Sequence, residues 1–264
     1  MDAFTSLQRS IERLVRIKCS NYKEDYIKRR ILSRMRLTNA TDYEAYHKYL
    51  LANPQEIDLL RNALTINVTK FFRDPEVFEV IRREVLPDLA RRRGSIRIWC
   101  AGCATGEEPY SIAILAHELT ALHRDVSVTI YATDIDAVVL QKAMTGIYDR
   151  KALENVDERQ IRKHFTSHDD GTFEVRPHIR DLVKFRQHDL MSGIPIARYL
   201  DVVTCRNVTI YFTEKQKNEL ARLFHSALGI DGYYIMGKTE YLAREVEHLF
   251  VPYNVAQKIL RKAA

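Results

Sequence analysis

The 264-residue sequence is poor in the residues that break or cross-link a chain, with only 9 glycines, 7 prolines, 4 cysteines and a single tryptophan. So little glycine and proline leaves no room for a long low-complexity linker. No stretch approaches about 18 uncharged apolar residues, which argues against a membrane span. The opening segment MDAFTSLQRSIERL has helical periodicity but lacks the apolar core of a signal peptide. We therefore expect a cytoplasmic globular protein whose cysteines stay reduced.

What the sequence has in excess is positive charge, and this charge is unevenly placed. The net charge is +6 at pH 7. Residues 9 to 36 alone hold ten Lys and Arg against three acids, so the remainder of the chain is close to neutral. A basic face of this kind attracts an acidic partner over long range. Composition alone is equally typical of a solvated helical surface.

The chain changes its periodicity at about residue 95. Residues 3–63 place apolar side chains at helical spacing, with an N-cap candidate at Thr41 and a break at Asn53-Pro54, which predicts a small helical bundle. Strands and helices then alternate: the expected strands are 96–100, 128–133, 182–186, 201–205 and 232–237, and the expected helices are 108–122, 136–144 and 214–228. This alternation predicts a parallel sheet covered on both faces. An Asp-Gly turn at 170–171 predicts an inserted antiparallel hairpin.

The stretch "IWCAGCATGEEPYS" (98–111) is the first candidate site. Cys100 and Cys103 lack further ligands at zinc spacing, and Cys100 closes a strand instead of opening a helix as a redox cysteine would. A Walker phosphate loop needs Lys-Ser/Thr where this loop has two acids. What remains is a strand, a tight glycine turn and a helix that begins with acids. Those acids repel phosphate and suit a nucleoside that carries an ammonium or sulfonium group.

The second expected strand ends in "YATDID" (131–136), about 30 residues after the glycine loop. An acid at this place in a doubly wound fold hydrogen-bonds ribose hydroxyls, and Asp134 is the candidate. The alternative role, an N-cap of the following helix, fits Asp136 better. Loop and acid together indicate a site for S-adenosylmethionine (AdoMet).

Five motifs occur in one order and spacing: "INVTKFFRD" (66–74), "WCAGCATGEEPYS" (99–111), "YATDID" (131–136), "FRQHDL" (185–190) and "VTCRNVTIYF" (203–212). In this register the chain resembles the chemotaxis receptor methyltransferases (CheR-type protein-glutamate O-methyltransferases) over nearly its whole length. The resemblance implies a class I AdoMet-dependent methyltransferase fold, α/β and Rossmann-like, with a doubly wound, mostly parallel sheet over residues 73–264. It also implies a small antiparallel β insert at about 164–188 and a basic, receptor-docking all-α domain over residues 1–72.

The resemblance also implies site residues. In that family an Asn-x-Thr-x-Phe-Phe-Arg segment helps to hold AdoMet, which here is Asn67, Thr69 and Arg73; taken alone, Arg73 would be an ordinary solvent-facing cation. The other implied cofactor contacts are Gly102, Glu107, Glu108, Asp134, Asp189, Leu190, Arg206 and Asn207. We favour Glu108 over Glu107. Arg73 and Tyr211 are the implied catalytic residues, which orient the incoming carboxylate, and no metal is implied.

The implied substrate is a set of glutamates on the acidic helical cytoplasmic domain of chemoreceptors, and the implied product is S-adenosylhomocysteine. A glutamate is already ionised at neutral pH, so the reaction needs no general base. The candidates for docking the receptor are Lys28, Arg29, Arg30, Arg34 and Arg36. Relatives that tether to a receptor's C-terminal pentapeptide carry a longer loop than "SHDDGTFEVRP", so we expect a tether-independent enzyme. A monomer is the default expectation, on which the loop has no bearing.

Two other functions compete with this interpretation. A nucleic-acid methyltransferase would use the basic helix on phosphates. The sequence has neither an Asn/Asp-Pro-Pro-Tyr motif nor a Pro-Cys nucleophile for such chemistry, so no nucleic-acid partner is expected. A non-enzymatic adaptor would have no need of Asn67, Arg73, Glu108, Asp134 and Asn207. We therefore expect an enzyme, and no insertion into a membrane.

Overall fold

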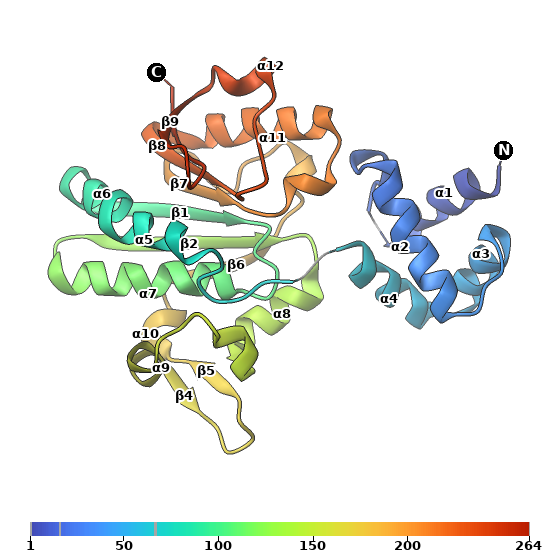
Figure 1. The fold of residues 1–264 in the computed structure, drawn as a ribbon, viewed down its shortest axis with the longest axis horizontal. Coiled ribbons are helices and arrows are strands. Elements are labelled where there is room, and N and C mark those ends of the chain that lie inside the picture. Colours follow the sequence, from blue (N-terminus) through green and yellow to red (C-terminus); the bar gives the residue numbers. More distant parts are fainter. Residues whose placement is uncertain (1, 16, 66–67, 264) are drawn as a thin grey trace. The chain divides into compact units, whose positions relative to one another are not determined.

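The computed structural model describes residues 2–15, 17–65 and 68–263, which divide into two compact units (Figure 1). The first unit holds Met1–Asn67 together with Tyr211–Gln216, and the second holds Val68–Ile210 and Lys217–Ala264. The sequence placed a domain boundary after residue 72. The units divide earlier because Phe71 and Phe72 are buried in the core of the second unit.

The first unit is a bundle of amphipathic helices: α1 (Ala3–Val15), η1 (a 3-10 turn, Cys19–Asn21), α2 (Glu24–Leu37), α3 (Tyr43–Ala52) and α4 (Pro54–Leu64). The break between α3 and α4 falls at Asn53-Pro54, as predicted. The predicted N-cap at Thr41 is wrong by one residue. Asp42 caps α3, because its carboxylate accepts a hydrogen bond from the backbone N–H of Ala45 at 2.8 Å.

The segment Tyr211–Gln216 belongs to the first unit through backbone hydrogen bonds. The N–H of Lys23 donates to the carbonyl of Tyr211 (3.0 Å), and the N–H of Thr213 donates to the carbonyl of Asn21 (3.1 Å). The rings of Tyr26 and Tyr211 lie 4.8 Å apart. Nothing in the local sequence indicates this placement, because the partners are about 190 residues away along the chain.

The second unit is built on a seven-stranded sheet in the order β6-β2-β1-β7-β8-β10-β9. The strands are β1 (Ser95–Ala101), β2 (Ser127–Asp134), β6 (Val183–Gln187), β7 (Leu200–Cys205), β8 (Leu228–Met236), β9 (Phe250–Asn254) and β10 (Ile259–Lys262). The five predicted strands pair in parallel, and β10 runs antiparallel to β8 and β9. The expected mostly parallel, doubly wound sheet is therefore confirmed. Strands β9 and β10 were not predicted.

Helices cover both faces of this sheet, with α7 below the strands and α11 above them in Figure 1. They are α5 (Pro75–Val80), α6 (Leu86–Arg92), α7 (Glu107–Leu122), α8 (Ala137–Thr145), α11 (Glu214–Ala227) and α12 (Arg244–Glu247), with a π-helical turn η2 (Ile81–Val85) between α5 and α6. The alternation of β1 explains the two layers. Ile98 and Cys100 share a core cluster with α7, whereas the ring of Trp99 lies 5.4 Å from that of Phe224 on α11.

A small antiparallel sheet, in the order β3-β5-β4, forms the insert. It comprises β3 (Ile147–Tyr148), β4 (Phe165–Ser167) and β5 (Phe173–Val175), accompanied by η3 (Arg150–Leu153), α9 (Glu158–His164) and α10 (Pro177–Arg180). The predicted hairpin turn is present, with Gly171 at φ +82°. The insert begins earlier than the predicted residue 164, because β3 supplies its third strand, and it ends before β6, which belongs to the main sheet.

Within the described residues no helix is long and apolar enough to cross a membrane, and no three His, Cys, Asp or Glu side chains are grouped so as to hold a metal ion.

A buried carboxylate organises the helical bundle. Glu56 on α4 accepts hydrogen bonds from Nε (2.9 Å) and Nη2 (2.7 Å) of Arg34 and from the hydroxyl of Tyr46 (2.7 Å). Burial alone would raise the pKa of Glu56, but the hydrogen bonds from Arg34 and Tyr46 outweigh it and the pKa is lowered. Because the folded-state pKa lies below the unfolded one, this stabilisation is complete above the unfolded pKa. It is lost as the pH falls through the folded pKa.

We predict that Glu56→Gln lowers the free energy of unfolding of the first unit by about 3 kcal/mol at pH 7, because Arg34 loses its countercharge. Hydrogen exchange of the α2–α4 amides in the full chain measures this loss. The difference from wild type should shrink in acid, where Glu56 is protonated in both states. The control is Glu44→Gln, which removes an exposed pair with Lys48 and should leave protection unchanged. Equal losses in the two variants would contradict the role of Glu56.

Candidate functional site

The predicted cofactor residues gather at the carboxyl ends of the parallel strands. The chain runs from β1 outward to β2 and β6, and later from β7 outward to β8 on the other side, so the strand order reverses between β1 and β7. Open α/β sheets bind ligands in the crevice at such a switch point. Gly102 directly follows β1, Asp134 ends β2, and Arg206 and Asn207 directly follow β7.

The glycine loop after β1 is held against β2 and against the loop after β7. The N–H of Gly102 donates to the carbonyl of Thr133 at 2.8 Å, and the N–H of Ala104 donates to Oδ2 of Asp134 at 2.9 Å. Gly102 has φ +75°, and a Cβ there would lie 2.7 Å from Cγ2 of Val208. Both the left-handed backbone and the close approach therefore require glycine at this position.

Asp134 is a buried carboxylate at the end of β2. Besides the N–H of Ala104, it accepts the N–H of Asp136 at 3.0 Å, and burial raises its pKa. A carboxylate offers about four acceptor positions, so two backbone donors leave capacity for ribose hydroxyls. Asp136 caps α8 by accepting the N–H of Val138, which agrees with the predicted division of roles between the two acids. The ribose contact itself stays a prediction.

The two acids that begin α7 have different surroundings. Glu107 is buried and accepts the hydroxyl of Thr105 at 2.7 and 2.9 Å, and burial raises its pKa. Glu108 instead connects α7 to the end of β7. Its Oε1 accepts the hydroxyl of Thr204 (2.6 Å), and its Oε2 accepts Nη1 of Arg206 (3.0 Å). These contacts favour Glu108 over Glu107 as the acid at the switch point.

Arg206 has a side chain that is only 2% exposed. Besides binding Glu108, its Nη2 donates to Oδ2 of Asp74 (2.7 Å) and to the carbonyl of Arg73 (2.8 Å), and its guanidinium lies 5.3 Å from the ring centre of Phe78. Two carboxylates therefore face one guanidinium, and one negative charge remains over. That surplus attracts a cationic ligand. The predicted direct contact of Arg206 with AdoMet stays a prediction, since its described hydrogen bonds go to protein groups.

The Phe-Phe-Arg-Asp segment is fixed on α7 and the insert. The N–H of Phe72 donates to the hydroxyl of Ser111 on α7 at 2.9 Å, and the N–H of Phe71 donates to the carbonyl of Ala152 at 3.0 Å. Phe72 and Asp74 have φ +49° and +58°, which lie in the left-handed region that residues other than glycine adopt only in a few per cent of cases. This strain is held in place by the contacts around it and is typical of functional sites.

The other residues of this segment are less enclosed. Arg73, between the two left-handed residues, is half-buried and donates Nη1 to the carbonyl of Val68 at 3.0 Å. Thr69 is half-buried, and Asn67 lies outside the described residues. The roles predicted for Asn67, Thr69 and Arg73 stay predictions.

The remaining predicted residues lie in two places. Asp189 is exposed after β6 and accepts the N–H of Met191 at 2.8 Å, which caps a short 3-10 turn η4 (Leu190–Ser192). Leu190 beside it is buried. Tyr211 ends the turn η5 (Thr209–Tyr211) and belongs to the first unit. The roles of these residues stay predictions.

The cysteines at the centre of the site are inert. Cys100, Cys103 and Cys205 are buried free thiols, and burial raises the pKa of each well above its usual value. A neutral buried thiol is a poor nucleophile and a poor metal ligand. The CxxC pattern therefore reflects packing.

The sequence missed four supporting residues: Asp74, Ser111, Thr204 and Glu240. Asp74, Ser111 and Thr204 stand inside the recognised motifs, so their position along the chain was a signal. Glu240 carries no such signal, because an acid in a loop is common. The partners of Thr204 and Glu240 lie about 30 to 100 residues away along the chain.

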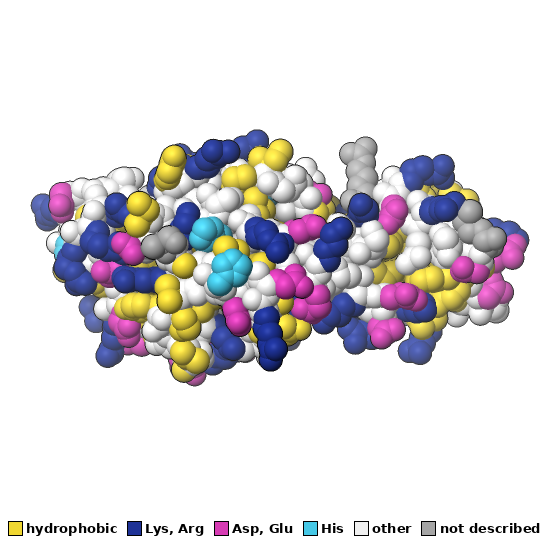
Figure 2. Space-filling model, turned by 90° about the horizontal axis from the view of Figure 1, so that it is seen from above, with side chains coloured by type: hydrophobic (Ala, Val, Ile, Leu, Met, Phe, Trp, Pro, Cys, Tyr) yellow, Lys and Arg dark blue, Asp and Glu magenta, His cyan; other side chains and the backbone are white. Residues whose placement is uncertain are grey.

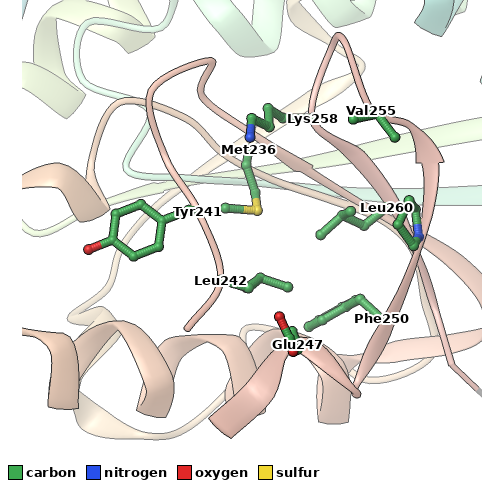
Figure 3. A pocket seen from close by; sticks show the side chains of 9 residues that line it. Met236, Tyr241, Leu242, Glu247, Phe250, Val255, Lys258 and Leu260 are labelled. Carbon is green, nitrogen blue, oxygen red and sulfur yellow. The ribbon is translucent and has the colours of Figure 1, made fainter. Parts of the chain in front are cut away.

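A separate pocket of about 420 Å³ lies at the antiparallel end of the sheet. In Figure 3 Met236, Leu242, Phe250 and Leu260 point into it, with Lys258 and Glu247 at opposite sides. None of the predicted cofactor residues lines this pocket, so it is distinct from the switch-point site.

Comparison with known proteins agrees with this geometry. Residues 67–259 match the family model "CheR methyltransferase, SAM binding domain", and residues 2–65 match "CheR methyltransferase, all-alpha domain". The chain is 34% identical over 230 residues to chemotaxis protein methyltransferase 2 of Vibrio cholerae serotype O1, which covers 85% of this chain and 80% of that protein. It is 35% identical over 246 residues to the chemotaxis protein methyltransferase of Escherichia coli K12, with 90% and 83% covered. The predicted resemblance and cofactor are confirmed: the chain belongs to the CheR methyltransferase family and is an S-adenosylmethionine-dependent methyltransferase of chemotaxis.

Proposed function

We propose that this enzyme transfers the methyl group of AdoMet to glutamate side chains of chemoreceptors and forms glutamyl methyl esters. The observation that carries the proposal is the pairing of the buried Arg206 with two partly exposed carboxylates, Glu108 and Asp74, whose surplus negative charge lies at the switch point. It suits a nucleoside that carries a sulfonium and an ammonium group. The names of the relatives, chemotaxis protein methyltransferases, support a chemotaxis protein as the substrate.

The chemistry requires little from the protein beyond placement. The glutamate oxygen attacks the methyl carbon in line with the breaking S–CH₃ bond, and the electron pair of that bond stays on sulfur to give S-adenosylhomocysteine. Because the carboxylate is already ionised, no proton has to be removed. Holding the two reactants in line supplies much of the rate. Arg73 and Tyr211 are the candidates for orienting the carboxylate, in a contact loose enough to leave it nucleophilic.

The cofactor contacts follow the strand ends. Glu108 faces the methionyl end of AdoMet, Asp134 the ribose, and Asp189 and Leu190 the adenine, while Asn207 follows β7 on the side of Glu108. This assignment is supported by the free acceptor capacity of Asp134 and by the order of the strands that carry these residues. Asn67, Thr69 and Gly102 complete the set.

The receptor-docking surface is narrower than the basic segment of the sequence. Arg34 is committed to Glu56 with its side chain only 14% exposed, and Lys28 forms an ion pair with Glu24. Arg30 lies over the ring of Tyr26. On the face shown in Figure 2, Lys and Arg side chains alternate with Asp and Glu instead of forming one block. Docking by charge therefore depends on particular side chains.

The exposed residues of α2 supply such a set. Arg29 and Arg36 are exposed, and the same helix exposes 40% of Leu32 and 69% of Leu37. Arg29, Leu32 and Arg36 share one face at i, i+3 and i+7, so α2 offers two cations around an apolar contact. An acidic amphipathic helix of a receptor fits this surface. The strand β4, only three residues long, offers little edge for an added peptide strand, which supports independence from a pentapeptide tether.

We predict that labelled methyl passes from AdoMet to receptor cytoplasmic fragments and is released as volatile methanol after base treatment. Esters are cleaved by base, whereas methylated amines and bases are stable. A receptor fragment with its surface glutamates changed to glutamine is the control and should remain unlabelled. Base-stable label, or equal labelling of the control fragment, would contradict the proposed reaction.

Arg73→Ala should lower the turnover of receptor methylation by about 100-fold, because a misplacement of the reacting carboxylate by about 1 Å lowers the rate by about this factor. The variant keeps the backbone carbonyl that binds Arg206, so the fold is preserved. Arg83→Ala, which removes an arginine whose side chain is 72% exposed, is the matched control and should turn over normally. Near-normal methyl transfer by Arg73→Ala would show that Arg73 does not orient the carboxylate.

Reversing two charges, Arg29→Glu with Arg36→Glu, should raise the KM for the receptor about tenfold at low salt, because like charges then face each other. The KM for AdoMet should not change. Added salt should reduce the difference from wild type, since exposed charges are screened. Arg124→Glu, an exposed reversal on the second unit, is the control. An unchanged KM at low salt would remove α2 as the docking surface.

A further inference from the structure

Glu240 is a buried acid whose function the known reaction does not assign. It lies after β8 and is only 3% exposed. Its Oε2 accepts the N–H of Gly237 (2.6 Å) and of Asn207 (3.1 Å). Its Oε1 accepts the N–H of Val208 (3.0 Å), and both the N–H (2.7 Å) and the hydroxyl (2.8 Å) of Thr209. Five donors from two loops thus converge on one carboxylate.

These hydrogen bonds fix the backbone of the loop that follows β7. Asn207 has φ +61°, a left-handed conformation that asparagine adopts more readily than most residues with a side chain. The N–H groups of Asn207, Val208 and Thr209 must all point to the same side of the loop, because they donate to a single carboxylate, that of Glu240. A concave set of backbone N–H groups of this kind is a strong anion site, and here a side chain of the same chain fills it.

The same loop is pressed against the glycine loop. A Cβ at Gly102 would lie 2.7 Å from Cγ2 of Val208, so the position of Val208 shapes the turn after β1. The other side is equally tight, since a Cβ at Gly237 would lie 2.7 Å from Oε2 of Glu240 and 2.8 Å from the N atom of Asn207. Glu240 therefore joins the ends of β1, β7 and β8 at the switch point.

We propose that Glu240 is a positioning residue for AdoMet. Five donors saturate the roughly four acceptor positions of its carboxylate, so it does not contact the cofactor. It acts through the loop 207–209, which it holds in the single conformation that presents Asn207 and seats Val208 on the glycine loop. A binding site held by such a support loses affinity when the support is loosened. The inference rests on the proposed placement of AdoMet at the switch point.

The test is direct calorimetric binding of S-adenosylhomocysteine to the full chain, which needs no receptor. Glu240→Gln keeps the size of the side chain but turns one acceptor oxygen into a donor that faces backbone N–H groups. We expect its Kd to rise about 10- to 100-fold, with an equal rise in the KM for AdoMet and no change in the KM for the receptor. Glu240→Asp keeps the charge and should recover part of the affinity. Wild-type affinity in Glu240→Gln would overturn the proposal.

Asp201→Asn is the matched control. Asp201 is also a buried carboxylate, which accepts the N–H of Arg97 at 2.8 Å, but it lies at the opposite end of β7. It should lose thermal stability without losing affinity. Equal losses of affinity for S-adenosylhomocysteine in Asp201→Asn and Glu240→Gln would show that Glu240 only stabilises the fold, and would overturn the proposal.

A second pair of variants covers the case in which Glu240→Gln does not fold. Gly237→Ala crowds the carboxylate without removing its charge and should weaken binding. Gly94→Ala, where the nearest atom to the new Cβ is 4.0 Å away, should not. Unchanged affinity in Gly237→Ala would count against the proposal. If the wild type binds S-adenosylhomocysteine but does not methylate receptors, the proposed substrate is wrong. The role of Glu240 is then still decided by the Kd of its variants for S-adenosylhomocysteine.

Discussion

The site depends on one buried cation, the guanidinium of Arg206. A charge removed from water must be paired and hydrogen-bonded, so the chain has to bring partners to it from distant segments. Glu108 comes from the first turn of α7, and Asp74 and the carbonyl of Arg73 come from the segment that enters the second unit. One guanidinium thereby fixes where the helix after the glycine loop begins and which way the Phe-Phe-Arg-Asp segment turns.

A buried anion completes this arrangement from the other side. Arg206 and Asn207 are neighbours, yet the side chain of Arg206 binds acids while the backbone of Asn207 binds the carboxylate of Glu240. The loop after β7 is thus held at two neighbouring residues, at Arg206 by the carboxylates that bind its side chain and at Asn207 by the carboxylate of Glu240 that binds its backbone. Because both contacts are buried, they persist in salt that would screen exposed pairs. The loop that follows β7 is therefore fixed in one conformation, as a reaction governed by alignment requires.

The sheet was predictable from the sequence where the signal is local. Runs of apolar residues followed by helical periodicity predicted five parallel strands and the helices between them. Strands β9 and β10 were not recognised, because the edge strand β9 contains Pro252 and β10 has only four residues, two of them the half-buried Arg261 and Lys262. The sequence also did not indicate that residues 211–216 belong to the first unit, since this depends on backbone hydrogen bonds to Asn21 and Lys23.

The site shows the same limit more sharply. Acids at the start of α7 predicted a cationic ligand, and the family resemblance favoured Glu108. The physical difference between the two adjacent acids appears only in the fold, which buries Glu107 beside Thr105 and directs Glu108 at Arg206, 98 residues further on. Residues that face a ligand recur in compact motifs because the ligand sets their spacing. Residues that hold them, such as Glu240, are constrained only through the folded backbone, so their function becomes visible only in the three-dimensional structure.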